Sequence, residues 1–258
     1  MQAQASERRD AQVLQSSGPT AIAVRGLSKT YGQGETATKA LQSVDLDVYP
    51  GEVLLMMGPS GSGKTTLLSM MGCILRATEG SVRIGERGEE IVGLRERDLP
   101  RVRLRYFGFV FQGFNLFPAL SAGENVEIAL DLKGTRGAEA KRRAAAALDS
   151  VGLSHKYDAP PADLSGGQQR VAIARAIVGD PEIILADELT AALDSMSGQA
   201  VMEMMINLAR QRNRAVVIVT HDDRVFKYAD RIVHIEDGRI IETDVRTRHA
   251  VGVTRKEQ

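Results

Sequence analysis

Cysteine pairs, tryptophan and membrane-length apolar runs are all missing from this chain of 258 residues. Because Cys73 is the only cysteine, no internal disulfide can form, and we expect a reducing, cytosolic setting. The longest apolar runs, at 52–57 and 215–220, have the size of strands and fall far short of the roughly 18–20 residues that cross a bilayer. If the protein works at a membrane, we therefore expect another chain to hold it there.

A net charge is missing as well, since 33 Lys and Arg residues balance 33 Asp and Glu residues. General nucleic-acid binders usually carry a basic excess, so this balance argues against that class. Polar residues without periodicity fill 1–20 and 246–258. We expect a flexible arm and a flexible tail there, with interaction segments as the alternative.

Short apolar strands alternate with helical patterns through the rest of the chain. An apolar i, i+3, i+4, i+7 pattern across 201–208, for example, predicts a helix. Buried strands separated by helices favour an α/β fold with a mostly parallel sheet that is covered on both faces. The predicted strands are 44–48, 52–57, 106–111, 182–187 and 215–220.

The stretch from about 113 to 165 has a helical texture of its own. Ser121 stands three residues before Glu124, the spacing of a capping box at a helix start. An alanine-rich run then predicts a second helix that ends at Gly152. We interpret 113–165 as a helical insertion without a strand of its own, and a purely structural role for its helices is the alternative.

The segment GPSGSGKTT follows the predicted strand 52–57 and matches G-x-x-x-x-G-K-[ST] in the strand-to-helix context that this motif requires. Its glycines let backbone N–H groups turn toward phosphate oxygens, Lys64 can contact the β- and γ-phosphates, and the Thr65 hydroxyl can bind Mg²⁺. A plain glycine turn before a helix is the alternative. The motif predicts a nucleoside triphosphate site made by Gly58, Pro59, Ser60, Gly61, Ser62, Gly63, Lys64, Thr65 and Thr66.

Three further polar residues follow predicted strands that end at the same edge of the sheet, where ligands of parallel sheets collect. Asp187 is the expected partner of Mg²⁺, and Glu188 can polarise the water that attacks the γ-phosphate. His221 can donate to a γ-phosphate oxygen and hold Glu188 in place, although a strand-end histidine is also commonly a hydrogen-bonded bystander.

Gln112 follows the predicted strand 106–111 and has both a donor and an acceptor, which suits a site that senses Mg²⁺ and water. The next loop is rich in apolar side chains, either for core packing or as a groove for a partner's helix. These side chains are Phe114, Leu116, Phe117 and Leu120.

A second glycine-rich loop, LSGGQ, precedes another predicted helix about a hundred residues later. The hydroxyl of Ser165 and the backbone N–H groups of Gly166, Gly167 and Gln168 can form a second anion site at a helix end. No second nucleotide is evident within one chain. Two copies arranged head to tail would place each Ser165 loop over the γ-phosphate that Lys64 of the other copy holds, so that ATP would join the dimer.

The phosphate-binding motif, Gln112, LSGGQ, ILADE, AALD and His221, in this order, resemble the ATP-binding cassette of ABC transporters across about 21–243. The resemblance implies a P-loop NTPase fold with an N-terminal antiparallel β subdomain, an ATP-binding domain over 21–245 and the helical subdomain at about 113–165. It also implies that Tyr31 stacks on adenine, that Asp194 lies in a loop at the dimer interface, and that a permease docks on the segment after Gln112.

Several stretches, such as FGFVFQGFNLFPALSAGENV, are most similar to the ATPases of macrolide, lipoprotein-releasing, glycolipid and haem exporters. This resemblance implies an ATPase bound to a separate permease at the cytoplasmic face of the inner membrane, and a periplasmic adaptor is a further partner that it allows. The same subgroup includes a cell-division ATPase, which leaves a regulatory or mechanical role open. A soluble ABC protein acting on nucleic acid or ribosomes is the other alternative.

The chain departs from the family pattern at two places. Leu189 replaces the usual proline after Glu188, and proline would fix φ at that position. LSGGQQR is one residue shorter than the commonest LSGGQxQR, which would rotate the following helix by about 100° relative to the loop. We expect slower or less tightly coupled hydrolysis, and we expect Leu189→Pro to raise the ATPase rate.

Overall fold

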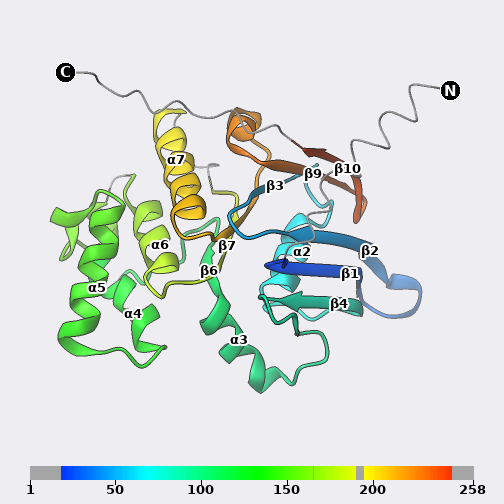
Figure 1. Ribbon diagram of the computed structural model, residues 1–258, viewed down its shortest axis with the longest axis horizontal. Helices are drawn as coiled ribbons and strands as arrows, with labels where there is room; N and C mark the ends of the chain where they lie inside the picture. The colour runs from blue at the N-terminus through cyan, green and yellow to red at the C-terminus, as the bar shows by residue number, and fades with distance from the viewer. Residues whose placement is uncertain (1–18, 165, 190–194, 246–258) are drawn as a thin grey trace.

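The computed structural model describes residues 19–164, 166–189 and 195–245 (Figure 1). Ser165, Asp194, residues 1–18 of the predicted arm and the whole predicted tail lie outside the described residues. Two sheets organise the rest, one six-stranded and one four-stranded. The α/β fold with a mostly parallel core sheet and an N-terminal antiparallel β subdomain is confirmed.

The six-stranded sheet has the order β10-β9-β3-β8-β7-β6, and all its neighbours are parallel except β9 and β10. Every residue of β3 and β8 is buried, as expected for strands covered on both faces. The strands are β3 Val53–Met57, β6 Phe107–Val110, β7 Ile183–Asp187, β8 Ala215–Val219, β9 Arg231–Glu236 and β10 Arg239–Val245.

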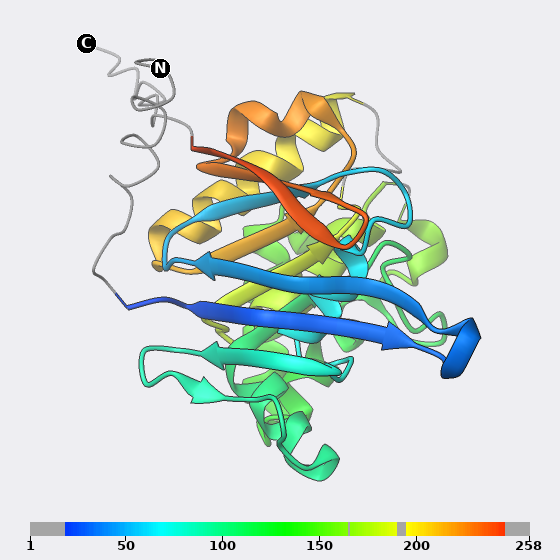
Figure 2. The ribbon, with the colours of Figure 1, turned by 90° about the vertical axis from the view of Figure 1, so that its right-hand side faces the viewer.

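The antiparallel sheet has the order β2-β1-β4-β5 and lies across the front of Figure 2. Its strands are β1 Ile22–Tyr31, β2 Thr38–Val48, β4 Glu79–Ile84 and β5 Glu89–Glu90. Strand β2 begins six residues before the predicted start at Val44, because its polar first half pairs with the end of β1. The apolar alternation marks only the second half of β2, although Leu41 in the first half is also buried in the core.

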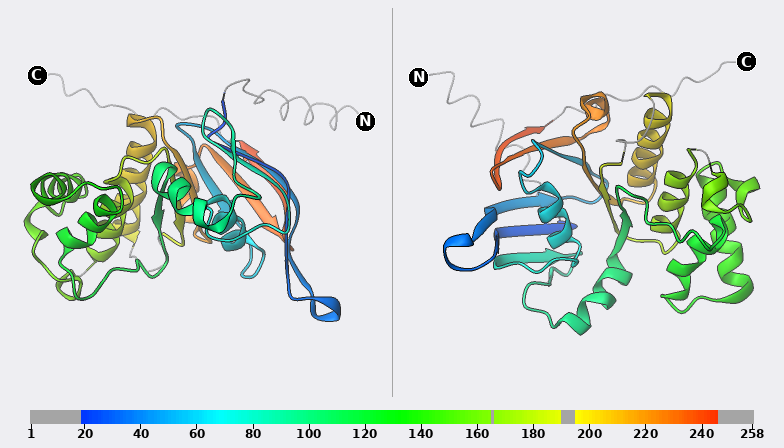
Figure 3. Two further views of the ribbon diagram at one scale, coloured as in Figure 1. Left: turned by 90° about the horizontal axis from the view of Figure 1, so that it is seen from below. Right: turned by 180° about the vertical axis from the view of Figure 1, so that it is seen from behind.

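Helices divide between two apolar clusters. One cluster lies between the two sheets and includes α2 Lys64–Met71, and the other joins the core sheet to α4 Ala122–Asp131, α5 Gly137–Ser150, α6 Gln168–Ile177 and α7 Ser195–Gln211 (Figures 1 and 3). The remaining α-helix is α3 Leu99–Tyr106. Short 3-10 helices cover Gly34–Thr36, Glu96–Asp98, Ser154–Lys156, Pro161–Asp163 and Asp223–Tyr228.

The connection from β6 to β7 contains α4, α5 and α6 and, within the described residues, no strand. The predicted capping box is confirmed, since the backbone N–H of Glu124 donates to Ser121 Oγ (3.2 Å) and the Ser121 N–H donates to Glu124 Oε2 (2.8 Å). The second helix ends at Ser150, and Gly152 follows with φ of 74°. Helix α6 packs against both α4 and α5.

The turn between β9 and β10 consists of Asp237 and Gly238, both with positive φ, as in the tight hairpin turns that match strand twist. The Gly238 N–H donates to the Ser62 carbonyl (3.0 Å), and the Gln42 N–H donates to the Gly238 carbonyl (2.8 Å). This turn therefore lies between β2 and the loop that follows β3. Among the helices of the described residues, none combines the length and apolar character that a bilayer crossing requires.

Candidate functional site

The loop from Gly58 to Gly63 joins β3 to α2 and needs glycine at both of its ends. A Cβ on Gly58 would lie 2.0 Å from the Ile235 carbonyl oxygen, and one on Gly63 would lie 2.5 Å from the Ala40 carbonyl oxygen. Both residues also have positive φ, 145° and 101°. Strands β9 and β2 thus press the loop into a narrow path that only glycine can follow.

Lys64 begins α2 and is the basic group of this loop. Its Nζ donates to the carbonyls of Gly58 (2.9 Å) and Pro59 (2.6 Å), with Ser62 Oγ at 3.4 Å. Burial lowers the pKa of Lys64, and the carboxylates of Glu188 and Asp187 act in the opposite direction. A cation at a helix N-terminus with inward-turned backbone N–H groups is a chemical environment suited to phosphate.

Asp187 ends β7 beside this loop, and its Oδ1 accepts a hydrogen bond from Thr65 Oγ1 (3.2 Å). Burial raises the pKa of Asp187, with a further rise from Glu188, while Thr65 and Lys64 oppose the shift. A hydroxyl and a carboxylate oxygen are suitable ligands for Mg²⁺, which otherwise keeps water and phosphate oxygens around it. No group of three or more His, Cys, Asp or Glu that could hold a metal alone is found in the described residues.

Glu188 follows Asp187 with φ of 52°, in the left-handed region that side chains other than glycine rarely adopt. Its backbone N–H donates to the carbonyl of Val219, the last residue of β8 (2.9 Å). His221 Nδ1 lies 2.8 Å from Glu188 Oε2, close enough for an ion pair if the imidazole is protonated. This buried oxygen has no hydrogen-bond partner in the described residues. The structure therefore brings Glu188 and His221 together.

Gln112 and Tyr31 lie at the ends of strands whose neighbours lead to the site. Gln112 is exposed just past the end of β6, which pairs with the end of β7 through Val110 and Ala186. Tyr31 ends β1, is 44% exposed and pairs with Thr38 at the start of β2. Strand β2 then reaches Gly63 through Ala40, so it connects the ring of the predicted adenine platform to the phosphate loop.

The segment after Gln112 is held from the helical side. The Arg175 guanidinium of α6 donates to the carbonyls of Phe114 (2.6 Å) and Asn115 (2.7 Å), and Asn125 bonds both backbone groups of Phe117. Phe114 and Leu116 pack partly against the core, whereas Phe117 is 51% exposed. Phe114 and Leu116 thus fit the core-packing alternative, and the groove for a partner's helix stays a prediction.

The second glycine loop leads into α6, for which Gly167 is the N-cap, and Gln168 Nε2 donates to the Pro161 carbonyl (2.8 Å). Figure 1 places α6 and α2 on opposite sides of β6 and β7. A contact that sequence reasoning missed lies here: Gln169 Nε2 donates to the carbonyl oxygen of Leu189. The two departures from the family pattern, Leu189 and the shortened LSGGQQR segment, are thus in contact with each other. In the sequence, the only signal for this contact is that each residue lies next to a motif.

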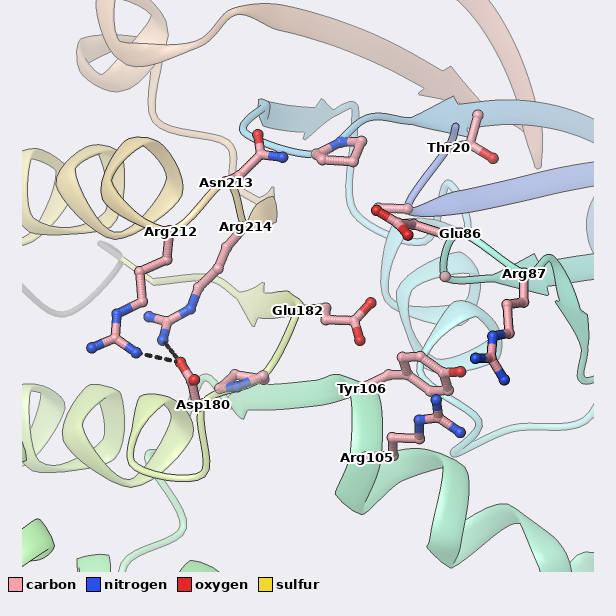
Figure 4. A pocket seen from close by; sticks show the side chains of 14 residues that line it. Thr20, Glu86, Arg87, Arg105, Tyr106, Asp180, Glu182, Arg212, Asn213 and Arg214 are labelled. Carbon is pink, nitrogen blue, oxygen red and sulfur yellow. Dashed lines mark hydrogen bonds and ion pairs between the residues drawn. The ribbon is translucent and has the colours of Figure 1, made fainter. Parts of the chain in front are cut away.

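A separate cavity of about 540 Å³ lies at the opposite, amino edge of the core sheet (Figure 4). Asp180 pairs there with Arg212 (2.8 Å) and with Arg214, whose side chain is 6% exposed. Burial alone would raise the pKa of Asp180, but its bonds to Arg214 and Arg212 outweigh burial and lower it. Glu182, Tyr106 and Arg105 also line the cavity. None of the predicted site residues lies there.

Comparisons with known proteins point to one family. Residues 41–191 match the family model described as ABC transporter. Two similar proteins are macrolide export ATP-binding/permease proteins MacB, from Wolinella succinogenes (42% identical over 85% of this chain) and from Sodalis glossinidius (46% identical over 88%). The chain spans 34% of the length of each of these two relatives.

Solved structures show the same likeness in three dimensions. A dimeric ATP-binding cassette in a post-hydrolysis state, bound to ADP and Pi, is 41% identical with a TM-score of 0.80 and covers 87% of this chain and 98% of that one. Another, cbiO1 from Clostridium perfringens, part of an ABC transporter complex, is 29% identical with a TM-score of 0.77, covering 87% of this chain and 88% of that one.

Proposed function

The chain belongs to the ATP-binding cassette family of ABC transporters, and we propose that it binds and hydrolyses ATP to drive a separate membrane permease. The observation that carries this proposal is that Lys64, at the start of α2, meets the adjacent residues Asp187 and Glu188, at the end of β7, at one sheet edge. Perturbed pKa values of an acid and a base in one place are typical of functional sites.

In this proposal the chain's residues position the triphosphate and the attacking water. The backbone of Gly58–Thr66 and the Lys64 ammonium bind the phosphates, and Thr65 and Asp187, with Gln112, hold Mg²⁺. When bound, Mg²⁺ offsets the negative charge on the transferred phosphoryl group. Glu188 accepts a hydrogen bond from the attacking water, and His221 keeps its carboxylate in place. Tyr31 stacks on the adenine ring.

The proposal includes a head-to-tail pair of chains. Ser165, Gly166, Gly167 and Gln168 of one copy would contact the γ-phosphate held by the other, with Asp194 at the interface. Two observations support this pair: α6 begins on the other side of β6 and β7 from the phosphate loop, and the similar solved cassette bound to ADP and Pi is dimeric.

The partner and location follow from the relatives. Their names join an ATP-binding part to a permease part, and the chain matches about a third of their length. We propose that this cassette acts with a permease that exports an amphiphilic compound, lipid or lipoprotein, at the cytoplasmic face of the inner membrane, with a periplasmic adaptor. The exposed Phe117 would belong to the docking surface. The subdomain boundary at 113–165 and the ends of the 21–245 domain stay predictions.

Phosphate release at a series of protein concentrations tests the proposal. We expect specific activity to rise with concentration as pairs form, and Ser165→Ala to lower it. Static light scattering with Mg²⁺ and ATP measures pairing in the same samples. Constant specific activity at dilutions where only single chains scatter, with no loss in Ser165→Ala, would refute the paired site.

A further inference from the structure

Gln169 is a polar residue in an apolar setting. It stands in the first turn of α6 and is 1% exposed. Its Nε2 donates to the carbonyl oxygen of Leu189, while its Oε1 has no hydrogen-bond partner in the described residues. Burying an amide with one of its polar atoms unpaired costs free energy. The presence of Gln169 at this position therefore needs an explanation, and its bond to the Leu189 carbonyl offers one.

The acceptor of this bond directly follows Glu188. The Glu188 backbone has φ of 52°, a conformation that persists only where the surroundings determine it strongly. On the side of β8 it is fixed by the bond from its N–H to the Val219 carbonyl (2.9 Å). On the other side the Leu189 side chain is buried at 2% exposure, and its carbonyl is held by Gln169.

We propose that Gln169 is a positioning residue that fixes the turn carrying Glu188 from the helix that begins at the second glycine loop. This inference rests on the proposed function, in which Glu188 orients the attacking water. Proline at position 189 would fix the turn through its ring. In this chain the side chain of Gln169 on α6 fixes the turn instead. The orientation of the Glu188 carboxylate therefore depends on the position of α6.

The contact also gives a path from the docking segment to the reaction. Helix α6 bonds the carbonyls of Phe114 and Asn115 through Arg175, and it bonds Leu189 through Gln169 six residues earlier. A shift of the segment after Gln112 would move the helix that holds the glutamate turn. Helix α6 therefore joins three parts of the site: the segment after Gln112, the second glycine loop and Glu188.

Two substitutions of Gln169 test the proposal. Gln169→Met keeps the length and removes the donor, and we expect kcat to fall about tenfold while KM for ATP changes less than about twofold. Gln169→Glu keeps the shape and makes donation depend on protonation. A neutral carboxyl can donate to the Leu189 carbonyl, whereas a carboxylate oxygen repels it. We expect its kcat relative to wild type to fall as pH rises from 6 to 8.5.

Arg143→Met is the matched control, because Arg143 donates to the Val178 carbonyl (2.9 Å) just after α6 ends and far along the helix from Leu189. We expect this variant to lose thermal stability and to keep kcat. If Gln169→Met keeps kcat within twofold of wild type, or if Arg143→Met loses as much, the inference is wrong. A flat pH profile of the Gln169→Glu to wild-type ratio would also overturn it, even if Gln169→Met fails to fold. If the wild type hydrolyses no ATP, the proposed function fails first.

Discussion

Strand β7 carries an aspartate and a glutamate near each of its ends, and the two pairs differ in their surroundings. At the amino end Asp180 is paired with Arg212 and Arg214, and its pKa is lowered. At the carboxyl end Asp187 has a raised pKa and Glu188 has a buried oxygen without a hydrogen bond. At the amino edge ion pairs favour the charged carboxylate of Asp180, whereas at the carboxyl edge burial disfavours the charged form of Asp187, as is typical of functional sites.

The largest expected difference between the two ends of β7 is in the rate of ATP hydrolysis. Glu188→Gln should lower ATP hydrolysis by about 10²-fold or more, because it removes the acceptor for the water proton, while ATP binding persists. Phosphate release and gel filtration with ATP measure both, and we expect the variant to accumulate as a nucleotide-bound dimer. Glu182→Gln, at the other end of β7, is the control and should hydrolyse at the wild-type rate. A variant of Glu188 that turns over normally would end its assigned role.

The next largest effects are expected at two buried cations, Lys64 and Arg214, on ATP affinity and on the free energy of unfolding. Lys64→Met should weaken ATP binding about 10- to 100-fold, since hydrogen bonds from charged groups contribute about 1.5–3 kcal/mol. Arg214→Met should leave binding unchanged and lower the free energy of unfolding by about 1 kcal/mol, because Asp180 is half-exposed and keeps Arg212. Calorimetric titration and urea unfolding measure the two. Loss of binding in Arg214→Met would contradict the separation of the edges.

Acid unfolding sharpens the same comparison with opposite signs. A lowered pKa means that Asp180 stabilises the fold above its unfolded pKa of about 3.9, and that this stabilisation is lost as pH falls through the lower folded value. A raised pKa means that ionised Asp187 destabilises the fold above its folded pKa, and that the penalty disappears as pH falls below the unfolded value.

Without nucleotide at pH 7, we therefore expect Asp180→Asn to be less stable than wild type and Asp187→Asn to be more stable, each by up to about 1 kcal/mol. Urea unfolding from pH 7 to pH 3 measures both differences, which should shrink as pH falls. Equal signs for the two variants would break the comparison.

The smallest expected effect is at Leu189. Leu189→Pro should raise the ATPase rate by a fewfold, because the ring fixes the turn that carries Glu188. It should also lower stability slightly, because the leucine side chain is 2% exposed. Phosphate release in both the wild-type and the Gln169→Met background measures it, and the gain should be larger where the amide is absent. An unchanged or lower rate in both would defeat the expectation.

The buried strands and the phosphate loop were predictable from the sequence, because apolar runs ending in glycine or acid depend only on local order. The antiparallel hairpin of β9 and β10 was harder to predict from the sequence. The predicted strands do not include 231–245, although Asp237-Gly238 between apolar alternations is a hairpin signal. The bond between Gln169 and Leu189 was beyond reach, since it depends on how α6 packs after a chain reversal.

The contact between the β9–β10 hairpin and the phosphate loop has a consequence for protein synthesis. Residues 58–66 leave the ribosome early, but the Ser62 carbonyl finds its donor only when Gly238 has emerged. The phosphate loop of a growing polypeptide therefore stays incomplete through most of translation. We expect truncated chains that stop before the hairpin not to bind ATP in pull-down assays. Nucleotide capture would thus report that the domain has been completed.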